Sequence, residues 1–165
     1  LGKIFDVEDR AKEIVDEIQS EVEKINKHLE SQPRLTAAVL EDEGGSYRVY
    51  GEDTLGGNVA VNGGAELAVG KHGENGNISA EDLIAVNPDA IFMVWYDGYS
   101  VGDVDYAGEH VVKLITEDPK FASLDAVKNG RVYPINLSGI YCSGMRTLDG
   151  ILDVSKNLYP ELYQD

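Results

Sequence analysis

The sequence predicts an α/β domain in which a small, mostly parallel sheet lies between layers of helices. Strand-like and helical segments alternate along the chain and are joined by short turns, an order typical of such layered domains. The segment AIFMVW, Ala90–Trp95, is continuously apolar, as a parallel strand covered by helices on both faces would be. The 165 residues, 42% of them hydrophobic, suffice for one domain of this kind.

The first element is predicted to be a long amphipathic helix from Asp6 to about Leu29. Apolar residues recur along it at spacings of three and four, which lines one face of a helix. We expect Asp6 to cap its N-terminus and Pro33 to end it. At about 1.5 Å per residue the helix would be roughly 35 Å long. A coiled coil is the less favoured alternative because regular opposite charges are missing from its flanks, so we expect a helix that braces a larger body.

Short strands and helices follow. Ser79 with Asp82 has the form of a capping box, and Pro88 ends the helix that the box begins. Asn129-Gly130 is a further helix stop. We expect strands at 35–40, 47–50, 90–95 and 131–136, and helices at 65–69, 79–87, 108–116, 121–128 and 145–158.

Aromatic residues gather where the predicted strands end. Trp95 and Tyr96 follow one strand, and Tyr141 lies shortly after the last. Parallel sheets bind ligands beyond the carboxyl ends of their strands, and large amphipathic rings there offer rigid contact area. Arg146 stands at the start of the last helix, where a cation opposes the helix dipole. We interpret this arginine as kept for an anionic group of a ligand.

Composition excludes several classes of function. The net charge of -16 removes the attraction to phosphate on which nucleic-acid binding depends, and it repels anionic membranes. Cys142 is the only cysteine, so an internal disulfide is impossible. The histidines, His28, His72 and His110, lack the spacing of a metal site, and we expect them on the solvated surface. Nucleotide-binding and nucleophile motifs are also missing from the sequence.

Four stretches, taken in order, resemble one family. They are DVEDRAKEI, ISAEDLIAVNPDAIF, DAVKNGRVYPI and MRTLDGILDVSKNLYPELY. Between about Gly2 and Tyr163 the chain is similar to the C-terminal lobe of the ABC-transporter substrate-binding proteins that take up iron siderophores, haem and cobalamin. The resemblance implies that residues 1–32 form a rigid helix linking two lobes. Residues 33–165 would form the three-layer C-terminal α/β lobe, with the N-terminal lobe outside this chain.

The resemblance also implies a binding protein rather than an enzyme, without a resident cofactor, located in the periplasm or anchored outside the cell membrane as a lipoprotein. An iron chelate (siderophore or haem) or a corrinoid would be held between the lobes. Glu81 matches the glutamate that docks onto the permease of the permease–ATPase complex. We expect Glu81 and the aromatic residues at opposite ends of one helix–strand unit. The implied ligand contacts are Tyr47, Trp95, Tyr96, Tyr141 and Arg146.

A second hypothesis stays open on the residues alone. Many α/β domains are small enzymes that hold a divalent metal with acidic side chains on their strand-end loops. Asp42 and Glu43 follow a predicted strand here. Solvated loops also explain such pairs in so acidic a chain, so the pattern does not decide between the two hypotheses.

Overall fold

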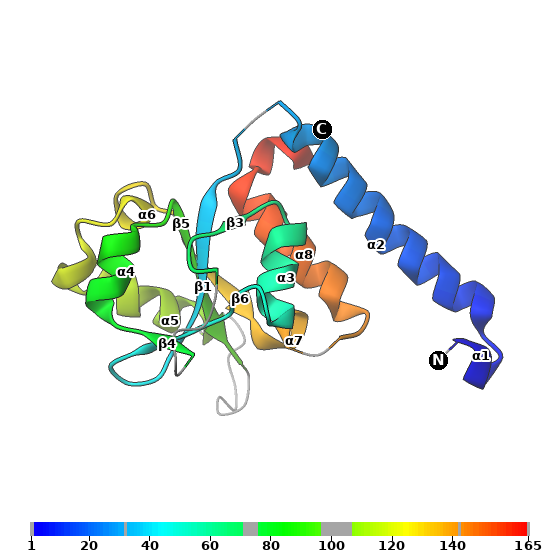
Figure 1. Cartoon of the computed structure of the whole chain (residues 1–165), viewed down its shortest axis with the longest axis horizontal. Coiled ribbons are helices and arrows are strands. Elements are labelled where there is room, and N and C mark those ends of the chain that lie inside the picture. Colours follow the sequence, from blue (N-terminus) through cyan, green and yellow to red (C-terminus); the bar gives the residue numbers. More distant parts are fainter. Residues whose placement is uncertain (1, 32, 71–75, 97–106, 142, 165) are drawn as a thin grey trace.

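The computed structural model describes residues 2–31, 33–70, 76–96, 107–141 and 143–164. Within these residues a single sheet has the strand order β4-β2-β1-β5-β6, with β3 paired to β1 (Figure 1). The strands are β1 (Thr36–Asp42), β2 (Tyr47–Val49), β3 (Glu66–Leu67), β4 (Asn77–Ile78), β5 (Ala90–Trp95) and β6 (Val132–Asn136). The helices are α1 (Gly2–Phe5), α2 (Glu8–Leu29), α3 (Leu55–Asn62), α4 (Ala80–Val86), α5 (Ala107–Thr116), α6 (Asp125–Lys128), α7 (Leu137–Ile140) and α8 (Arg146–Leu158), with 3-10 turns η1 (Pro119–Phe121) and η2 (Pro160–Tyr163).

The sheet is parallel at its centre and antiparallel at one edge. Strand β1 runs parallel to β3 and β5, and β5 runs parallel to β6. Strand β2 is antiparallel to both β1 and β4. The predicted small, mostly parallel sheet is therefore confirmed, and the antiparallel edge comes from the tight turn at Gly44 and Gly45, which both have positive φ.

Strand β5 separates two apolar cores, one on each face of the sheet. Phe92 points to the face covered by α3, α7, α8 and the end of α2. Ile91 and Met93 point to the face covered by α4, α5 and α6, and Figure 1 shows these two groups of helices on opposite sides of the sheet. All three side chains are fully buried. The continuous apolar pattern of this strand thus predicts its position correctly.

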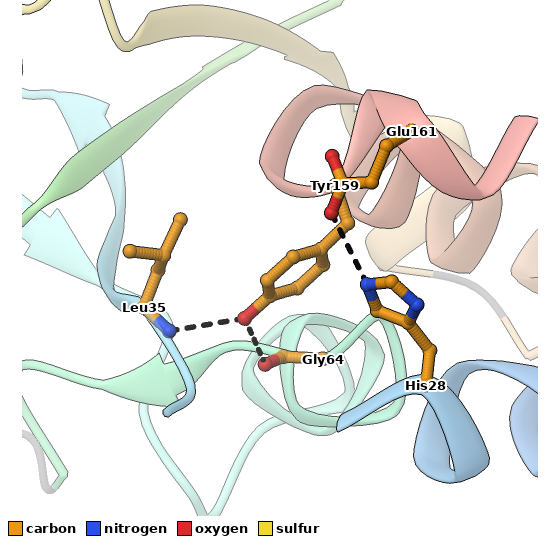
Figure 2. Close-up of polar contacts among 5 residues, drawn as sticks. All are labelled: His28, Leu35, Gly64, Tyr159 and Glu161. Carbon is orange, nitrogen blue, oxygen red and sulfur yellow. Dashed lines mark hydrogen bonds and ion pairs between the residues drawn. The ribbon is translucent and has the colours of Figure 1, made fainter. Parts of the chain in front are cut away.

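A buried tyrosine fixes the segment that follows α2, and a histidine–glutamate contact fixes the end of α2 itself (Figure 2). The Tyr159 hydroxyl accepts a hydrogen bond from the Leu35 backbone N–H at 3.0 Å and donates one to the Gly64 carbonyl at 3.1 Å. The Nε2 atom of His28 lies 3.1 Å from a carboxylate oxygen of Glu161. The expectation that His28 is a solvated side chain is wrong, because its side chain is only 20% exposed.

Helix α2 differs from its prediction at the N-terminus, while its predicted end at Leu29 is confirmed. It begins at Glu8, because Asp6 takes a positive φ of 55° between α1 and α2 and so cannot serve as the cap. It ends at Leu29, before Pro33 is reached. Ile25 and Leu29 are its buried residues. In Figure 1 the helix is a long rod whose first half extends away from the sheet.

The main error of the sequence prediction is the helix expected at 65–69. The helix is α3, which begins after its cap Thr54, whose hydroxyl accepts from the Gly57 N–H. Residues 66–67 form β3 instead, paired with β1. The segment LGGNVAVN suggests a loop by propensity, since glycine disfavours helices. Tertiary packing overrides this, because a Cβ on Gly57 would lie 2.0 Å from the Gly51 carbonyl oxygen.

Two smaller differences remain. The helix expected at 121–128 is divided into η1 and α6, because Leu124 is extended with ψ at 137°. The short α7, capped by the Asn136 side chain, directly follows β6 and was not expected. In contrast, the predicted capping box of Ser79 and Asp82 is formed at the start of α4.

Candidate functional site

The carboxyl ends of β1 and β5 meet at one edge of the sheet. Leu40 of β1 pairs with Met93 of β5, so the last residues of both strands extend to the same edge. The antiparallel β2 begins there too, because Asp42 pairs with Tyr47. This carboxyl edge is where ligands bind to parallel sheets.

The larger of the two hollows described at this edge, which we call the β1–β5 hollow, has a volume of about 450 Å³. Two carboxylates lie on its β1 side, while aromatic and aliphatic side chains from β5 and α5 form the rest. Tyr96 is 50% exposed, so part of its ring is free for contact. The lining residues are Glu41, Asp42, Val94, Trp95, Tyr96, His110, Val111 and Leu114.

A smaller hollow of about 210 Å³, the β2–α3 hollow, lies beside it. It combines the Arg48 guanidinium with the rings of Tyr50 and Tyr141 and with the first turn of α3. Tyr141, at the end of α7, is 63% exposed. The remaining lining residues are Val49, Thr54, Leu55, Gly56 and Ile140.

One hydrogen bond connects the two hollows. The Tyr50 hydroxyl donates to a carboxylate oxygen of Glu41 at 2.8 Å, and each residue lines a different hollow. Burial, followed by the Glu41 carboxylate, raises the pKa of Tyr50 well above its usual range. The hydroxyl therefore stays protonated at neutral pH and can act as a hydrogen-bond donor.

Charges next to the hollows are partly paired. The Arg48 guanidinium forms an ion pair with Glu43. A hydrogen bond from Asn77, with a smaller effect from Arg48, lowers the pKa of Glu43. Glu43 is thus held as an anion, and its presence beside Arg48 offsets the positive charge of that residue.

The structure separates the sequence-predicted ligand contacts. Trp95 and Tyr96 line the β1–β5 hollow, while Tyr141 lines the β2–α3 hollow. Arg146 begins α8 as expected and donates a 3.0 Å hydrogen bond to the Ser138 hydroxyl of α7. It lines neither of these hollows.

Tyr47 lies in the core. It is 4% exposed, and its ring packs edge-on against Phe121 with 5.9 Å between the ring centroids. Almost no surface of this ring is open to a ligand, so Tyr47 supports the carboxyl edge as a core residue.

Glu81 lies at the carboxyl edge as well, in the exposed first turn of α4. Ile78 pairs with Tyr47 at this edge, and α4 begins two residues later. Asp118 raises the pKa of Lys120, and both Tyr47 and Glu81 act in the same direction, so both lie within electrostatic range of Lys120. The expectation that Glu81 and the aromatic residues lie at opposite ends is therefore wrong. The start of a helix that packs antiparallel to a strand lies beside that strand's end.

Several polar residues of the hollows are not among the ligand contacts predicted from the sequence, among them Glu41, Tyr50 and His110. His110 lies in the first turn of α5, and the alternation of strand and helix places that turn beside the end of β5. The same rule applied to the sequence could have found it.

Among the described residues, no group of three or more His, Cys, Asp or Glu side chains is arranged to hold a metal ion. The alternative hypothesis of an acidic metal-dependent enzyme gains no support from this part of the chain. Within the same residues, the helices are each too short or too polar to cross a membrane. His72, Tyr99 and Cys142 lie outside the described residues.

Comparison with known proteins decides the family. The family model described as periplasmic binding protein matches residues 1–136. The chain belongs to this family. No curated protein matches the sequence.

Solved structures of periplasmic binding proteins share the fold. One from Veillonella parvula DSM 2008 is 30% identical with a TM-score of 0.85, covering 99% of this chain and 49% of that chain. The Fe3+-hydroxamate transport protein of Saccharomonospora viridis DSM 43017 is 21% identical with a TM-score of 0.73, covering 96% of this chain and 52% of that one. S. aureus IsdE, solved with heme, is 23% identical with a TM-score of 0.69, covering 96% and 60%.

This periplasmic binding protein chain thus spans about half the length of the first of these structures. The family and its structural neighbours are substrate-binding proteins of transport systems rather than enzymes. The predicted three-layer lobe fold is confirmed by the agreement with the first structure.

Proposed function

We propose that this chain is one lobe of the substrate-binding component of an ABC importer. Its carboxyl edge forms half of a cleft that captures an iron chelate (siderophore or haem) or a corrinoid outside the cytoplasm, in the periplasm or on a lipoprotein. The observation that carries the proposal is the β1–β5 hollow, where Trp95 and Tyr96 stand beside the strand ends. A volume of about 450 Å³ falls within the usual range of small-molecule sites.

We further propose that residues 1–32 link this lobe to an N-terminal lobe and that residues 33–165 are the C-terminal lobe. The exposed apolar residues that precede or belong to α2 support this: Ile4 and Phe5 lie in α1, Val7 lies between α1 and α2, and Val15 lies in α2. A group of exposed apolar side chains is expected to be covered by another part of the protein. Ligand contacts from Trp95, Tyr96, Tyr141 and Arg146 would be completed by residues of the other lobe, with Tyr47 as support.

Glu81 is proposed to dock onto arginines of the permease, which works with its ATPase. Its exposure in the first turn of α4, at the same edge as the hollows, supports this role. Docking at that edge would place the open side of the cleft against the permease. A bound ligand could then be released directly into the transport path.

The chain carries its own reporter for the ligand test. Trp95 is its only tryptophan and lines the β1–β5 hollow. Titration with ferric siderophores, haem and cobinamide is expected to change Trp95 fluorescence with saturation for at least one of them. A flat response to all of them rules out the proposed binding role of this edge.

The docking test separates Glu81 from the ligand site. In cells carrying the transporter, Glu81→Ala is expected to lower uptake at least about fivefold, as the loss of an ion pair of ~1 kcal/mol would. Ligand affinity should not change. Asp82→Asn is unsuitable as a control because Asp82 forms the capping box. Glu109→Gln in the exposed first turn of α5 is the matched substitution, and unchanged uptake by Glu81→Ala excludes the docking role.

A further inference from the structure

We propose that the β1–β5 hollow takes a chelate with a net positive charge, placed against the Trp95 ring. This inference rests on the proposed function and adds the charge class of the substrate. It follows from the chemistry of the lining, the pairing of the nearby charges and the shape of the hollow.

The described lining of the hollow carries negative charge without a compensating lysine or arginine. Glu41 and Asp42 contribute two carboxylates, and the other lining residues are His110 and apolar or aromatic side chains. Arg48, the guanidinium nearest in sequence, is paired with Glu43. Glu43 and Glu41 both act on the Arg48 guanidinium, so this one cation compensates only part of the charge of Glu41, Asp42 and Glu43, and an excess of negative charge remains next to the hollow.

Tyr50 holds Glu41 in position beside the hollow. Its hydroxyl donates to the Glu41 carboxylate at 2.8 Å, and burial, followed by Glu41, raises the pKa of that hydroxyl. The donor is therefore present throughout the neutral pH range, and it orients the carboxylate.

The aromatic side of the hollow suits the same ligand. The faces of indole and phenol rings attract cations, and Trp95, at the end of β5, and Tyr96, which follows it, line the same hollow as the two carboxylates of the neighbouring strand β1. The indole Nε1 atom is confined by α5, since a Cβ on Gly108 would lie 3.5 Å from it. Arg146, the residue suited to an anionic group, lines a different part of the edge and donates to Ser138.

Long-range electrostatics acts in the same sense. The chain carries a net charge of -16, which attracts cationic ligands to a cleft and repels anionic ones. A chelate that carries three negative charges would meet repulsion both at a distance and within the hollow. A chelate with one positive charge would be attracted both at a distance and within the hollow.

The test uses three gallium complexes, of which the first two are built on the same chelator and differ in charge. Gallium complexes avoid the quenching of fluorescence that ferric iron causes. The first probe is the gallium complex of a linear trihydroxamate with a free terminal ammonium group, which has one net positive charge. The second is the same complex with the amine acetylated, which is neutral. The third is a gallium tricatecholate with three negative charges.

Titration of Trp95 fluorescence in the chain should rank the three probes by charge. The cationic complex is expected to bind at least about tenfold more tightly than its neutral form, as one charge interaction near a protein surface allows. The tricatecholate should bind more weakly than both. Raising the ionic strength from about 0.02 to about 0.5 M should reduce the difference between the first two probes, because salt screens exposed charges.

A variant locates the effect in the hollow. Asp42→Asn removes a charge from the lining, and it should reduce the preference for the cationic complex at least about threefold. Glu66→Gln makes the same change in an exposed residue of β3, which pairs with the opposite end of β1, and should leave the preference intact. If both variants reduce the preference for the cationic complex equally, the preference comes from the overall charge of the chain rather than from this hollow, and the assignment is overturned.

Failure of the inference can be told apart from failure of the proposed function. Equal affinity for the cationic and neutral complexes, or tighter binding of the tricatecholate, overturns the charge assignment but keeps the binding role. A flat fluorescence response to all three probes, to haem and to cobinamide rejects both.

Discussion

The hydroxyl of Tyr50 donates a 2.8 Å hydrogen bond to Glu41, and this bond lies between the two hollows of the carboxyl edge. Tyr50 directly follows β2 and α3 packs over it, since a Cβ on Gly56 would lie 2.7 Å from its ring. The tyrosine is thereby fixed in position, and it orients the carboxylate that faces the larger hollow.

Alkaline pH should weaken the fold through Tyr50. Its pKa is raised in the folded state by burial and by Glu41, so the folded protein keeps the phenol proton after the unfolded chain has lost it, above about pH 10. The stabilising contribution is therefore complete below about pH 10 and is lost as pH rises toward the folded-state pKa. Stability measured by urea unfolding should fall less steeply above about pH 10 in Tyr50→Phe than in the native chain.

Two comparisons make this test specific. At pH 7, Tyr50→Phe should cost about 1–2 kcal/mol, because a hydrogen bond to a charged group is lost, and the two stability curves should converge as the pH rises. Glu41→Gln keeps an acceptor and removes the charge, so its slope should lie between those of the native chain and Tyr50→Phe. Parallel curves for all three proteins would contradict the role given to this bond.

Removal of the Tyr159 hydroxyl should destabilise the attachment of α2. Tyr159→Phe leaves the Leu35 N–H and the Gly64 carbonyl without this partner, and leaving buried polar groups unpaired costs about 1–3 kcal/mol. Tyr163→Phe is the matched control, because the buried Tyr163 hydroxyl has no hydrogen-bond partner among the described residues. It should be neutral or slightly stabilising in the same denaturant titration, and equal losses in the two variants would refute the distinction.

Gly64 should tolerate no side chain. It has a φ of +101°, and an added Cβ would lie 2.8 Å from the Tyr159 ring and 3.0 Å from the Leu29 side chain. We expect Gly64→Ala to lower the free energy of unfolding by about 2–4 kcal/mol, from strain in the backbone and overpacking together. Gly130→Ala also changes a glycine with positive φ, but nothing lies within 4 Å of its Cβ position. It should cost about 1 kcal/mol, and a cost as large as that of Gly64→Ala would contradict the packing argument.

Sequence patterns predict the parts of this fold that depend on neighbouring residues. The apolar run of β5 and the Ser79 capping box were located correctly because burial on both faces and helix capping are encoded within a few residues. Helix α3 was misplaced because its stability depends on the contact of Gly57 with Gly51. Such a contact leaves no periodic signal in the sequence.

The residues of the candidate site could likewise be predicted from the sequence only in part. Trp95 and Tyr96 could be found because they follow directly after a buried strand. Glu41 could not be joined to them from the sequence, since this requires the register of β1 against β5. The same register corrects the position of Glu81, which depends on the pairing of β4 with β2.

The anchoring of α2 should reside in its last two turns. Ile25 is fully buried in the core that includes Leu29 and α8, whereas Val15 on the same helix is 50% exposed. Ile25→Ala should therefore lower the free energy of unfolding of this chain by about 2–5 kcal/mol, the usual cost of a cavity in a core. Val15→Ala should change it by no more than about 0.5 kcal/mol. Hydrogen exchange should be slow near Ile25 and fast near Val15, because the residues of α2 that pack against this core are Ile18, Val22, Ile25 and Leu29, all of which come after Val15. Strong protection around Val15 in the chain alone would contradict this division of the helix.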